Sequence, residues 1–254
     1  MARLKDKVAI ILGASDARSM GAATARRFAA EGAKLVLAAR RQDAVAEIAR
    51  EIGGVAVACD ITQEADIAAM VQAALDHYGK LDVAINYAGI SFNEPILEST
   101  PETLRAASDV HFVGSTLFIK HAARAMKDGG SIITTSTLTA IVAPPGMAAY
   151  AGSKKGVDQV VRIAAVELGP KNIRVNSIAP GLTRSAMTEA YFEMEPVLNA
   201  FLREMPLGRF PSVEDIANAA LWLASDEAFT TGQVIDITGG QSLKRIPTAE
   251  DMDG

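Results

Sequence analysis

Between Val8 and Arg41 the chain reads VAIILGASDARSMGAATARRFAAEGAKLVLAARR, the stretch that decides the fold. An apolar run of strand length is followed by a loop from Gly13 to Gly21, a helical pattern that stops at Gly32, and a second apolar run. Glycine is the usual residue just after a helix end. Strands that are apolar throughout are typical of a sheet covered on both faces. The stretch therefore predicts a strand–helix–strand unit with two parallel strands.

The remainder of the chain repeats this alternation, with no internal repeat, low-complexity segment or linker. It predicts an α/β fold, a doubly wound parallel sheet of about seven strands in a single domain over 1–254, which is the Rossmann arrangement. In such a sheet, ligands bind beyond the carboxyl ends of the strands. The expected strands are 7–14, 34–40, 55–60, 81–89, 130–137, 173–180 and 232–240, and the expected helices are 21–33, 42–54, 62–79, 101–127, 148–170 and 211–225.

The composition is that of an ordinary soluble domain: 254 residues, 49% of them hydrophobic and 22% charged. The net charge is −5 without a basic block, which argues against a nucleic-acid partner. The longest apolar runs are far too short to cross a bilayer, and the opening MARLKDK has no apolar secretory region. Cys59 is the single cysteine, so no internal disulfide can form. We expect a cytoplasmic protein without a nucleic-acid or membrane partner, and we predict no metal site.

Tyr150 and Lys154 lie four residues apart in the helix expected over 148–170, so they share one face. An ammonium near a phenol favours the phenolate and lowers the phenol's pKa from about 10. Such a tyrosine can donate a proton to a carbonyl oxygen or accept one from an alcohol. A pattern of two residue types also occurs by accident, with the tyrosine in the core and the lysine in solvent. The neighbouring motifs therefore decide whether this pair is catalytic.

Polar elements at the ends of three expected strands supply those surroundings. Thr137 lies thirteen residues before Tyr150, the sequence NYAG (Asn86–Gly89) ends the preceding strand, and NSIAPG (Asn176–Gly181) ends the following one. With these elements in this order, the chain resembles a short-chain dehydrogenase/reductase over about Lys5–Gly240. The resemblance implies an oxidoreductase that transfers a hydride between a nicotinamide cofactor and a carbonyl/alcohol pair.

The resemblance also implies a role for each catalytic candidate. Tyr150 is the acid/base, and Lys154 lowers its pKa and holds the nicotinamide ribose. The family's substrate-polarising serine corresponds to Thr137, whose hydroxyl has the same donor and acceptor capacity. Ser136 is the alternative, although adjacent strand side chains point to opposite faces. His111 stands where the family commonly has an asparagine that holds a water linking the lysine to solvent; it is either a similar relay or a hydrogen-bonded structural residue.

The loop GASDARSMG (Gly13–Gly21) cannot be laid on the family's common Gly-x-x-x-Gly-x-Gly spacing without a two-residue insertion. It resembles the loop of the enoyl reductase branch: glycine, five residues, then serine and an aliphatic residue. Gly13 allows the tight turn, Ser19 can cap the helix, and the N–H groups of Ser19 and Met20 at a helix N-terminus favour an anion. The resemblance implies further cofactor contacts from Ser15, Arg18, Asp60, Ile61, Asn86, Ala88, Gly89, Pro180, Gly181, Thr183 and Ser185.

The residues after the second strand indicate which nicotinamide cofactor is used. NAD-binding proteins of this fold usually place an acidic residue there, whereas this chain has Ala39 followed by Arg40 and Arg41. A guanidinium suits a 2′-phosphate, so NADP(H) is favoured and NAD(H) stays possible. Arg18 could add a second contact, and Arg40 could instead stack on the adenine or face water. The resemblance places Asp60 at the adenine amino group; it could instead cap the next helix.

Segment 182–211 corresponds to the family's substrate lid, and residues 241–254 form a short C-terminal tail. The lid is rich in apolar side chains, which suggests an apolar carbonyl or alcohol substrate; the same side chains could pack on their own domain or on a neighbour. The resemblance also implies a homo-oligomer, a dimer or tetramer, that pairs through the helices near Pro101–Lys127 and Tyr150–Leu168.

Three alternatives to an NADP-dependent carbonyl/alcohol enzyme stay open. One is an NAD-dependent alcohol dehydrogenase of the same family. Another is an enoyl reductase, but those relatives place tyrosine and lysine about seven residues apart, and Ala148 stands at that spacing here. The third is a non-catalytic NADP-sensing protein, suggested by the altered loop, Thr137 and His111 and opposed by the intact Tyr150 and Lys154.

Overall fold

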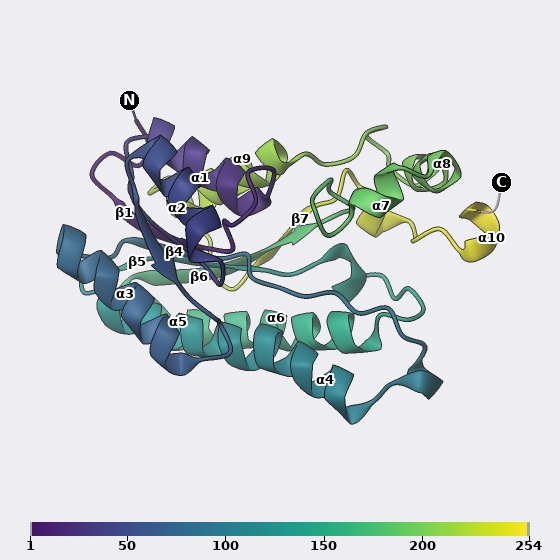
Figure 1. Cartoon of the computed structure of the whole chain (residues 1–254), viewed down its shortest axis with the longest axis horizontal. Coiled ribbons are helices and arrows are strands. Elements are labelled where there is room, and N and C mark those ends of the chain that lie inside the picture. The colour runs from purple at the N-terminus through teal and green to yellow at the C-terminus, as the bar shows by residue number, and fades with distance from the viewer. Residues whose placement is uncertain (1, 253–254) are drawn as a thin grey trace.

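Seven parallel strands form one sheet, in the order β3-β2-β1-β4-β5-β6-β7, and helices cover both of its faces (Figure 1). The computed structural model describes residues 2–252, so Met1 and the end of the expected tail, Asp253–Gly254, lie outside the described part. Every strand pairing is parallel, which confirms the doubly wound α/β sheet in a single domain. The strands are β1 Val8–Leu12, β2 Lys34–Ala39, β3 Val55–Ala58, β4 Val83–Asn86, β5 Gly130–Thr135, β6 Ile173–Pro180 and β7 Val234–Ile237.

Helices alternate with the strands, and further short helices occupy the lid region and the C-terminal end. Ser212 and Asp215 form a capping box at the start of the last long helix, as their spacing indicates. Within residues 2–252, no helix combines the length and the apolar character needed to cross a membrane. The helices are α1 Met20–Ala30, α2 Gln42–Ile52, α3 Glu64–Tyr78, α4 Pro101–Ala107, α5 Gly114–Ala125, α6 Ala148–Leu168, α7 Glu189–Phe192, α8 Glu195–Arg203, α9 Val213–Ala224 and α10 Ala249–Met252.

Two hydrophobic cores lie on opposite faces of the sheet, because side chains alternate along a strand. In β1, Val8, Ile10 and Leu12 pack with α3, α5 and α6. Ala9 and Ile11 pack with α1, α2 and α9. The first set of helices runs along the bottom of Figure 1 and the second along its top. The strands are therefore apolar on both faces, as expected for a covered parallel sheet.

The helix expected over 101–127 is divided into three parts. Between α4 and α5 the chain forms a π-helical segment, η2 (Ser108–Val113), without leaving the helical path. Such segments are rare and frequently lie at functional sites; this one carries His111. At its end, Gly114 lies directly against Ile61, where a Cβ would be 2.7 Å from Ile61 Cγ1. The small residue lets the start of α5 lie against the loop after β3.

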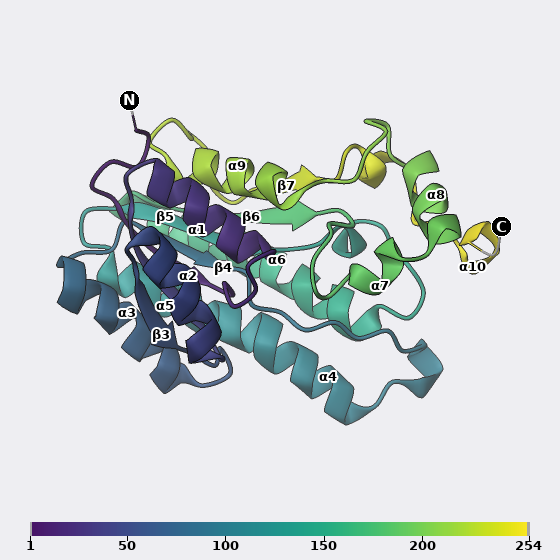
Figure 2. The ribbon, with the colours of Figure 1, turned by 45° about the horizontal axis from the view of Figure 1, so that its top comes forward.

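The carboxyl ends of the strands form the edge at which the candidate residues gather. β1 and β4 are neighbours in the sheet, although β2 and β3 lie between them in the sequence, so the chain order switches direction there. A crevice at such a switch point is the usual ligand site of this fold. Helices α7 and α8, in the segment expected to form a substrate lid, lie beyond this edge, where α10 contacts α8 (Figure 2).

Candidate active site

Tyr150, Lys154 and Thr137 meet where β5 ends and α6 begins. Tyr150 lies in the first turn of α6 and Lys154 one turn later. The Thr137 side chain lies near enough to the Tyr150 hydroxyl to affect its pKa, and Thr137 Oγ1 also lies 3.2 Å from Thr139 Oγ1. Lys154 Nζ donates a hydrogen bond to Thr135 O at 2.6 Å. Lys154 is buried, with 5% of its surface exposed. Backbone of the loop after β4 passes close by, since a Cβ on Gly89 would lie 3.7 Å from Lys154 Nζ.

Burial sets the proton affinities of this pair. It raises the pKa of Tyr150, while the contact with Thr137 acts in the opposite direction. Burial also lowers the pKa of Lys154 to about 8, against the opposing charge of Asp158. We expected Lys154 to lower the pKa of Tyr150; in this structure desolvation of the phenol outweighs any such effect.

Ser136, the alternative to Thr137, does not join this group. Its Oγ donates a hydrogen bond to Asp158 Oδ2 at 3.0 Å, and both side chains are buried. Adjacent strand residues point in opposite directions, so Ser136 turns away while Thr137 reaches Tyr150. The sequence analysis missed Asp158, whose signal is its position one turn after Lys154 on the same face of α6. Burial raises the pKa of Asp158, and the bond from Ser136 lowers it.

His111 has a protein partner at each ring nitrogen. Its Nε2 accepts the Ile90 N–H at 3.1 Å, so in the neutral ring the proton is on Nδ1, which donates to Ser153 Oγ at 2.8 Å. The ring also meets the Tyr150 ring edge to face, with centroids 5.4 Å apart. Burial and the charge of Lys154 lower the pKa of His111 to about 3. The geometry favours a hydrogen-bonded structural residue over a proton relay.

The loop after β1 needs its glycines for close packing. Gly13 has φ +99°, and a Cβ there would lie 2.8 Å from the Tyr87 carbonyl carbon. A Cβ on Gly21 would lie 2.5 Å from Gly13 O. Larger residues would push the first helix away from the loop and the end of β4. This is the close approach of backbone that a phosphate-binding loop requires.

The start of α1 fits an anion, with one correction. Ser19 caps the helix as expected, because its Oγ accepts the Ala22 N–H at 3.1 Å. Its own N–H donates to Asp16 O at 2.9 Å. The expected contact of that N–H with an anion is therefore wrong, since the turn within the loop uses it. The N–H groups of Met20 and Gly21 have no acceptor among the described residues, and they suit the pyrophosphate of a dinucleotide.

Arg40 and Asp60 lie at the ends of the neighbouring strands β2 and β3. Asp60 Oδ1 accepts hydrogen bonds from the N–H and the hydroxyl of Thr62, at 2.9 and 2.8 Å. These bonds lower the pKa of Asp60, with a smaller contribution from Arg40. Arg40 itself is exposed. The Arg41 guanidinium reaches Ser15 O at 3.4 Å. A guanidinium beside a carboxylate at this edge can bind an adenosine moiety.

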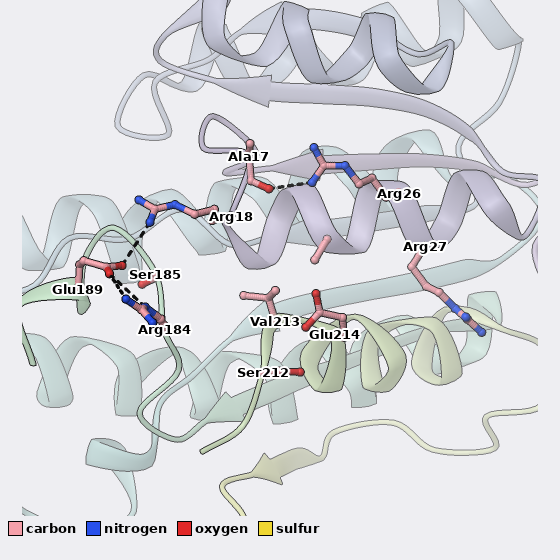
Figure 3. A pocket seen from close by; sticks show the side chains of 11 residues that line it. Ala17, Arg18, Arg26, Arg27, Arg184, Ser185, Glu189, Ser212, Val213 and Glu214 are labelled. Carbon is pink, nitrogen blue, oxygen red and sulfur yellow. Dashed lines mark hydrogen bonds and ion pairs between the residues drawn. The ribbon is translucent and has the colours of Figure 1, made fainter. Parts of the chain in front are cut away.

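Arg18 points to α7 rather than to this edge. Its guanidinium lies 3.5 Å from Glu189 of α7 and 3.9 Å from Asp16. Glu189 also pairs with Arg184 at 2.6 Å. Figure 3 shows both arginines converging on this carboxylate, at one end of a groove of about 630 Å³ between the loop, α1, the lid and the start of α9. The pattern of the lid did not single out Glu189.

The remaining candidates lie in turns at the same edge. Asn86 donates to Ser115 Oγ at 3.0 Å and accepts the Ala88 N–H at 2.9 Å, so it ties the end of β4 to α5. Pro180 ends β6, and the Gly181 N–H donates to Ile237 O at 3.0 Å. The hydroxyls of two lid candidates bond locally: Thr183 to Gly181 O at 3.1 Å, and Ser185 to Thr188 at 3.1 Å.

Comparison with known proteins identifies the family. A family model described as enoyl-(acyl carrier protein) reductase matches residues 13–242. A short-chain dehydrogenase reductase of Arabidopsis thaliana is 41% identical, over 94% of this chain and 93% of its own length. This chain is a short-chain dehydrogenase/reductase. The resemblance drawn from its motifs is thereby confirmed.

Further relatives agree with this assignment. The short-chain dehydrogenase/reductase is similar to trans-4-hydroxycyclohexanecarboxylate dehydrogenase of Sinomonas cyclohexanicum, with 36% identity over 94% of each chain. A solved short-chain dehydrogenase/reductase from Mycobacterium ulcerans superposes with a TM-score of 0.91 and 33% identity, covering 99% of this chain and 98% of that one. The protein is therefore an NAD(P)-dependent enzyme of this family that acts on a small molecule.

Proposed function

We propose that this enzyme transfers a hydride between NADP(H) and a carbonyl/alcohol pair on an apolar substrate. The observation that carries the proposal is the meeting of Tyr150, Thr137 and buried Lys154 at the carboxyl end of β5. The named activity of the Sinomonas relative, oxidation of a hydroxyl on a cyclohexane ring, supports a secondary alcohol as the reacting group.

The chain's own groups account for the proton transfer. Tyr150 donates its phenolic proton to the carbonyl oxygen during reduction and accepts it from the alcohol during oxidation. Thr137 donates a hydrogen bond to the same oxygen and polarises the carbonyl. Lys154 stays charged below about pH 8 and stabilises the phenolate left on Tyr150. A bound nicotinamide supplies the hydride to the carbonyl carbon or accepts it from the alcohol carbon.

We assign the cofactor contacts by the same geometry. The N–H groups of Met20 and Gly21 would hold the pyrophosphate, and Lys154 the nicotinamide ribose. Arg40 would hold the 2′-phosphate, because it directly follows Ala39, which stands where an acidic residue would otherwise select NAD. Asp60 would lie at the adenine. The remaining contacts expected from the family, Ser15, Arg18, Ile61, Asn86, Ala88, Gly89, Pro180, Gly181, Thr183 and Ser185, stay predictions.

Enoyl reduction is the second candidate, because the family model that matches this chain carries that description. The four-residue spacing of Tyr150 and Lys154 supports carbonyl chemistry instead. The phosphate loop alone resembles the enoyl reductases. That loop binds the part of the cofactor remote from the reacting atoms, so it does not decide the reaction.

The test is turnover of NADPH and NADH with a panel of cyclohexanones, aliphatic ketones and an enoyl thioester, and of the matching alcohols in the reverse direction. We expect activity on a ketone/alcohol pair and a fall in kcat of about 100-fold or more in Tyr150→Phe, the usual size of an acid–base contribution. Reduction of the enoyl thioester without ketone turnover would overturn the proposal. Tight NADPH binding without any turnover would favour the non-catalytic sensor.

The proposal extends to the enzyme's location in the cell, its assembly, and its lid and tail segments. We place it in the cytoplasm as a homo-oligomer, in keeping with its net charge of −5 and its single cysteine. Segment 182–211 would be the substrate lid. Residues 241–254 would form a tail that contacts the lid through α10 and α8.

A further inference from the structure

Arg26 connects the phosphate loop to the outer side of two helices. From α1, its Nη1 donates to Ala17 O at 2.7 Å, a contact visible in Figure 3. Its Nε and Nη2 donate to the two carboxylate oxygens of Glu51 in α2, at 2.7 and 2.8 Å. A bidentate arginine–carboxylate pair fixes the guanidinium plane. Glu51 therefore orients the arginine whose third donor holds the loop.

The contact falls on the part of the loop that exceeds the family's common length. Within the loop, Asp16 accepts the Arg18 N–H on its side chain at 2.8 Å and the Ser19 N–H on its carbonyl at 2.9 Å. These two bonds fold the segment into a tight turn with Ala17 at its exposed tip. The turn leads directly into Met20 and Gly21. A shift of its tip would therefore be passed to those N–H groups.

The energy of the ion pair does not explain this arrangement. Arg26 and Glu51 have half-exposed side chains, and exposed ion pairs contribute little to stability. Arg27, the next residue, makes a single bond to Glu31 in the same helix at 3.0 Å and lines the same groove. Arg26 differs from Arg27 in its two bonds to a carboxylate of another helix and in its bond to a loop carbonyl.

We propose that Arg26, oriented by Glu51, is a positioning residue for cofactor binding, because it holds Ala17 and so fixes the N–H groups of Met20 and Gly21. It acts through the loop and touches neither cofactor nor substrate. This inference rests on the proposed function in one respect, that the loop Gly13–Gly21 binds the pyrophosphate.

The test compares Arg26→Ala with Arg27→Ala, which removes the same side chain from the same helix without a loop contact. The Kd of NADPH is measured by fluorescence titration, kcat at saturating NADPH, and the thermal midpoint for each variant. In Arg26→Ala we expect Kd to rise on the order of 10-fold, as when a hydrogen bond to a charged group is lost, with kcat within about 2-fold. Arg27→Ala should leave Kd unchanged.

Two further variants sharpen the comparison. Glu51→Gln keeps a hydrogen-bonding side chain but loses the charge, so its Kd should fall between those of the wild type and Arg26→Ala. Arg26→Lys can still reach Ala17 O but lacks the planar fork, so it should restore the affinity only in part. A Kd that rises equally in Arg26→Ala and Arg27→Ala would overturn the inference, as would a lowered thermal midpoint with an unchanged Kd.

A separate pair of variants tests whether the loop Gly13–Gly21 binds the pyrophosphate at all. Met20→Pro removes one N–H at the first position of α1, where proline is tolerated; Met20→Leu serves as the reference for the lost side chain. An unchanged NADPH Kd in Met20→Pro would overturn the placement of the pyrophosphate. A raised Kd in Met20→Pro together with an unchanged Kd in Arg26→Ala would overturn the role of Arg26 alone.

Discussion

Lys154 carries its charge in a buried position, with the Thr135 carbonyl as its hydrogen-bond acceptor and Asp158 one turn away. Burial lowers its pKa to about 8, so the ammonium is lost as the pH rises through that value. A pattern of residue types could suggest Lys154 as a partner of Tyr150. It could not show that desolvation would bring the pKa of the lysine into the range of an activity assay.

The pH dependence of carbonyl reduction tests the charge states at this site. We expect kcat/KM to fall as the pH rises above about 8, since Lys154 then loses its proton. His111, with its pKa near 3, stays neutral from pH 5 to 8 and should add no acidic limb. The profiles of the wild type and His111→Asn should have the same shape. An acidic limb near pH 6.5 that disappears in His111→Asn would restore His111 as a proton relay.

Arg40 decides the cofactor in our assignment. Arg40→Asp should raise the KM for NADPH by about 10- to 100-fold, the range for a lost bond between charged groups, and should change the KM for NADH by less than about 3-fold. Steady-state kinetics with both cofactors measures the ratio. Arg50→Asp, at an exposed position on α2 away from the site, is the matched control. Equal effects of Arg40→Asp on the two cofactors would contradict NADP preference.

At the scale of elements, the order of strands and helices could be predicted from the sequence, while their ends could not. The expected strands 7–14, 55–60 and 81–89 run on into loops; the observed strands end at Leu12, Ala58 and Asn86. The last residues of the expected strands are the polar and small ones that we propose as ligand contacts at the carboxyl edge, where the backbone leaves the sheet. The π-helical segment in 101–127 was missed because its hydrophobic pattern is continuous with the flanking helices.

The lid helix α7 and the phosphate loop are joined by Glu189, which lies between Arg184 and Arg18. We expect Glu189→Gln to loosen the lid and to raise the KM for cofactor by about 2- to 5-fold, the range for an exposed ion pair. Tryptic cleavage of the lid should also be faster. Glu195→Gln, in the next helix and exposed, is the control. Unchanged cleavage and KM in Glu189→Gln would show that this contact does not hold the lid.

For the whole molecule, one face of α6 and η2 presents apolar side chains to solvent. Val166 is 79% exposed, Ile163 49% and Phe112 41%. Apolar groups gathered in this way favour an interface between copies of the chain. Val166→Glu should therefore lower the mass measured by light scattering. Leu97→Glu, at a position 96% exposed elsewhere on the surface, should leave it unchanged. Equal masses in the two variants would place the interface elsewhere.

The sequence by itself determined the class of fold and the family, because both are written in local patterns: apolar runs alternating with helices, and short motifs at fixed spacing. Only the tertiary structure decided which polar groups meet. In the folded structure Ser136 points toward Asp158, and His111 has two protein partners. Arg18 points toward Glu189 and not toward the place beside Arg40 where a 2′-phosphate would bind. Each of these contacts joins residues far apart in the chain or depends on which way a side chain turns. Burial, which sets the pKa values of Tyr150 and Lys154, likewise exists only once the chain has packed.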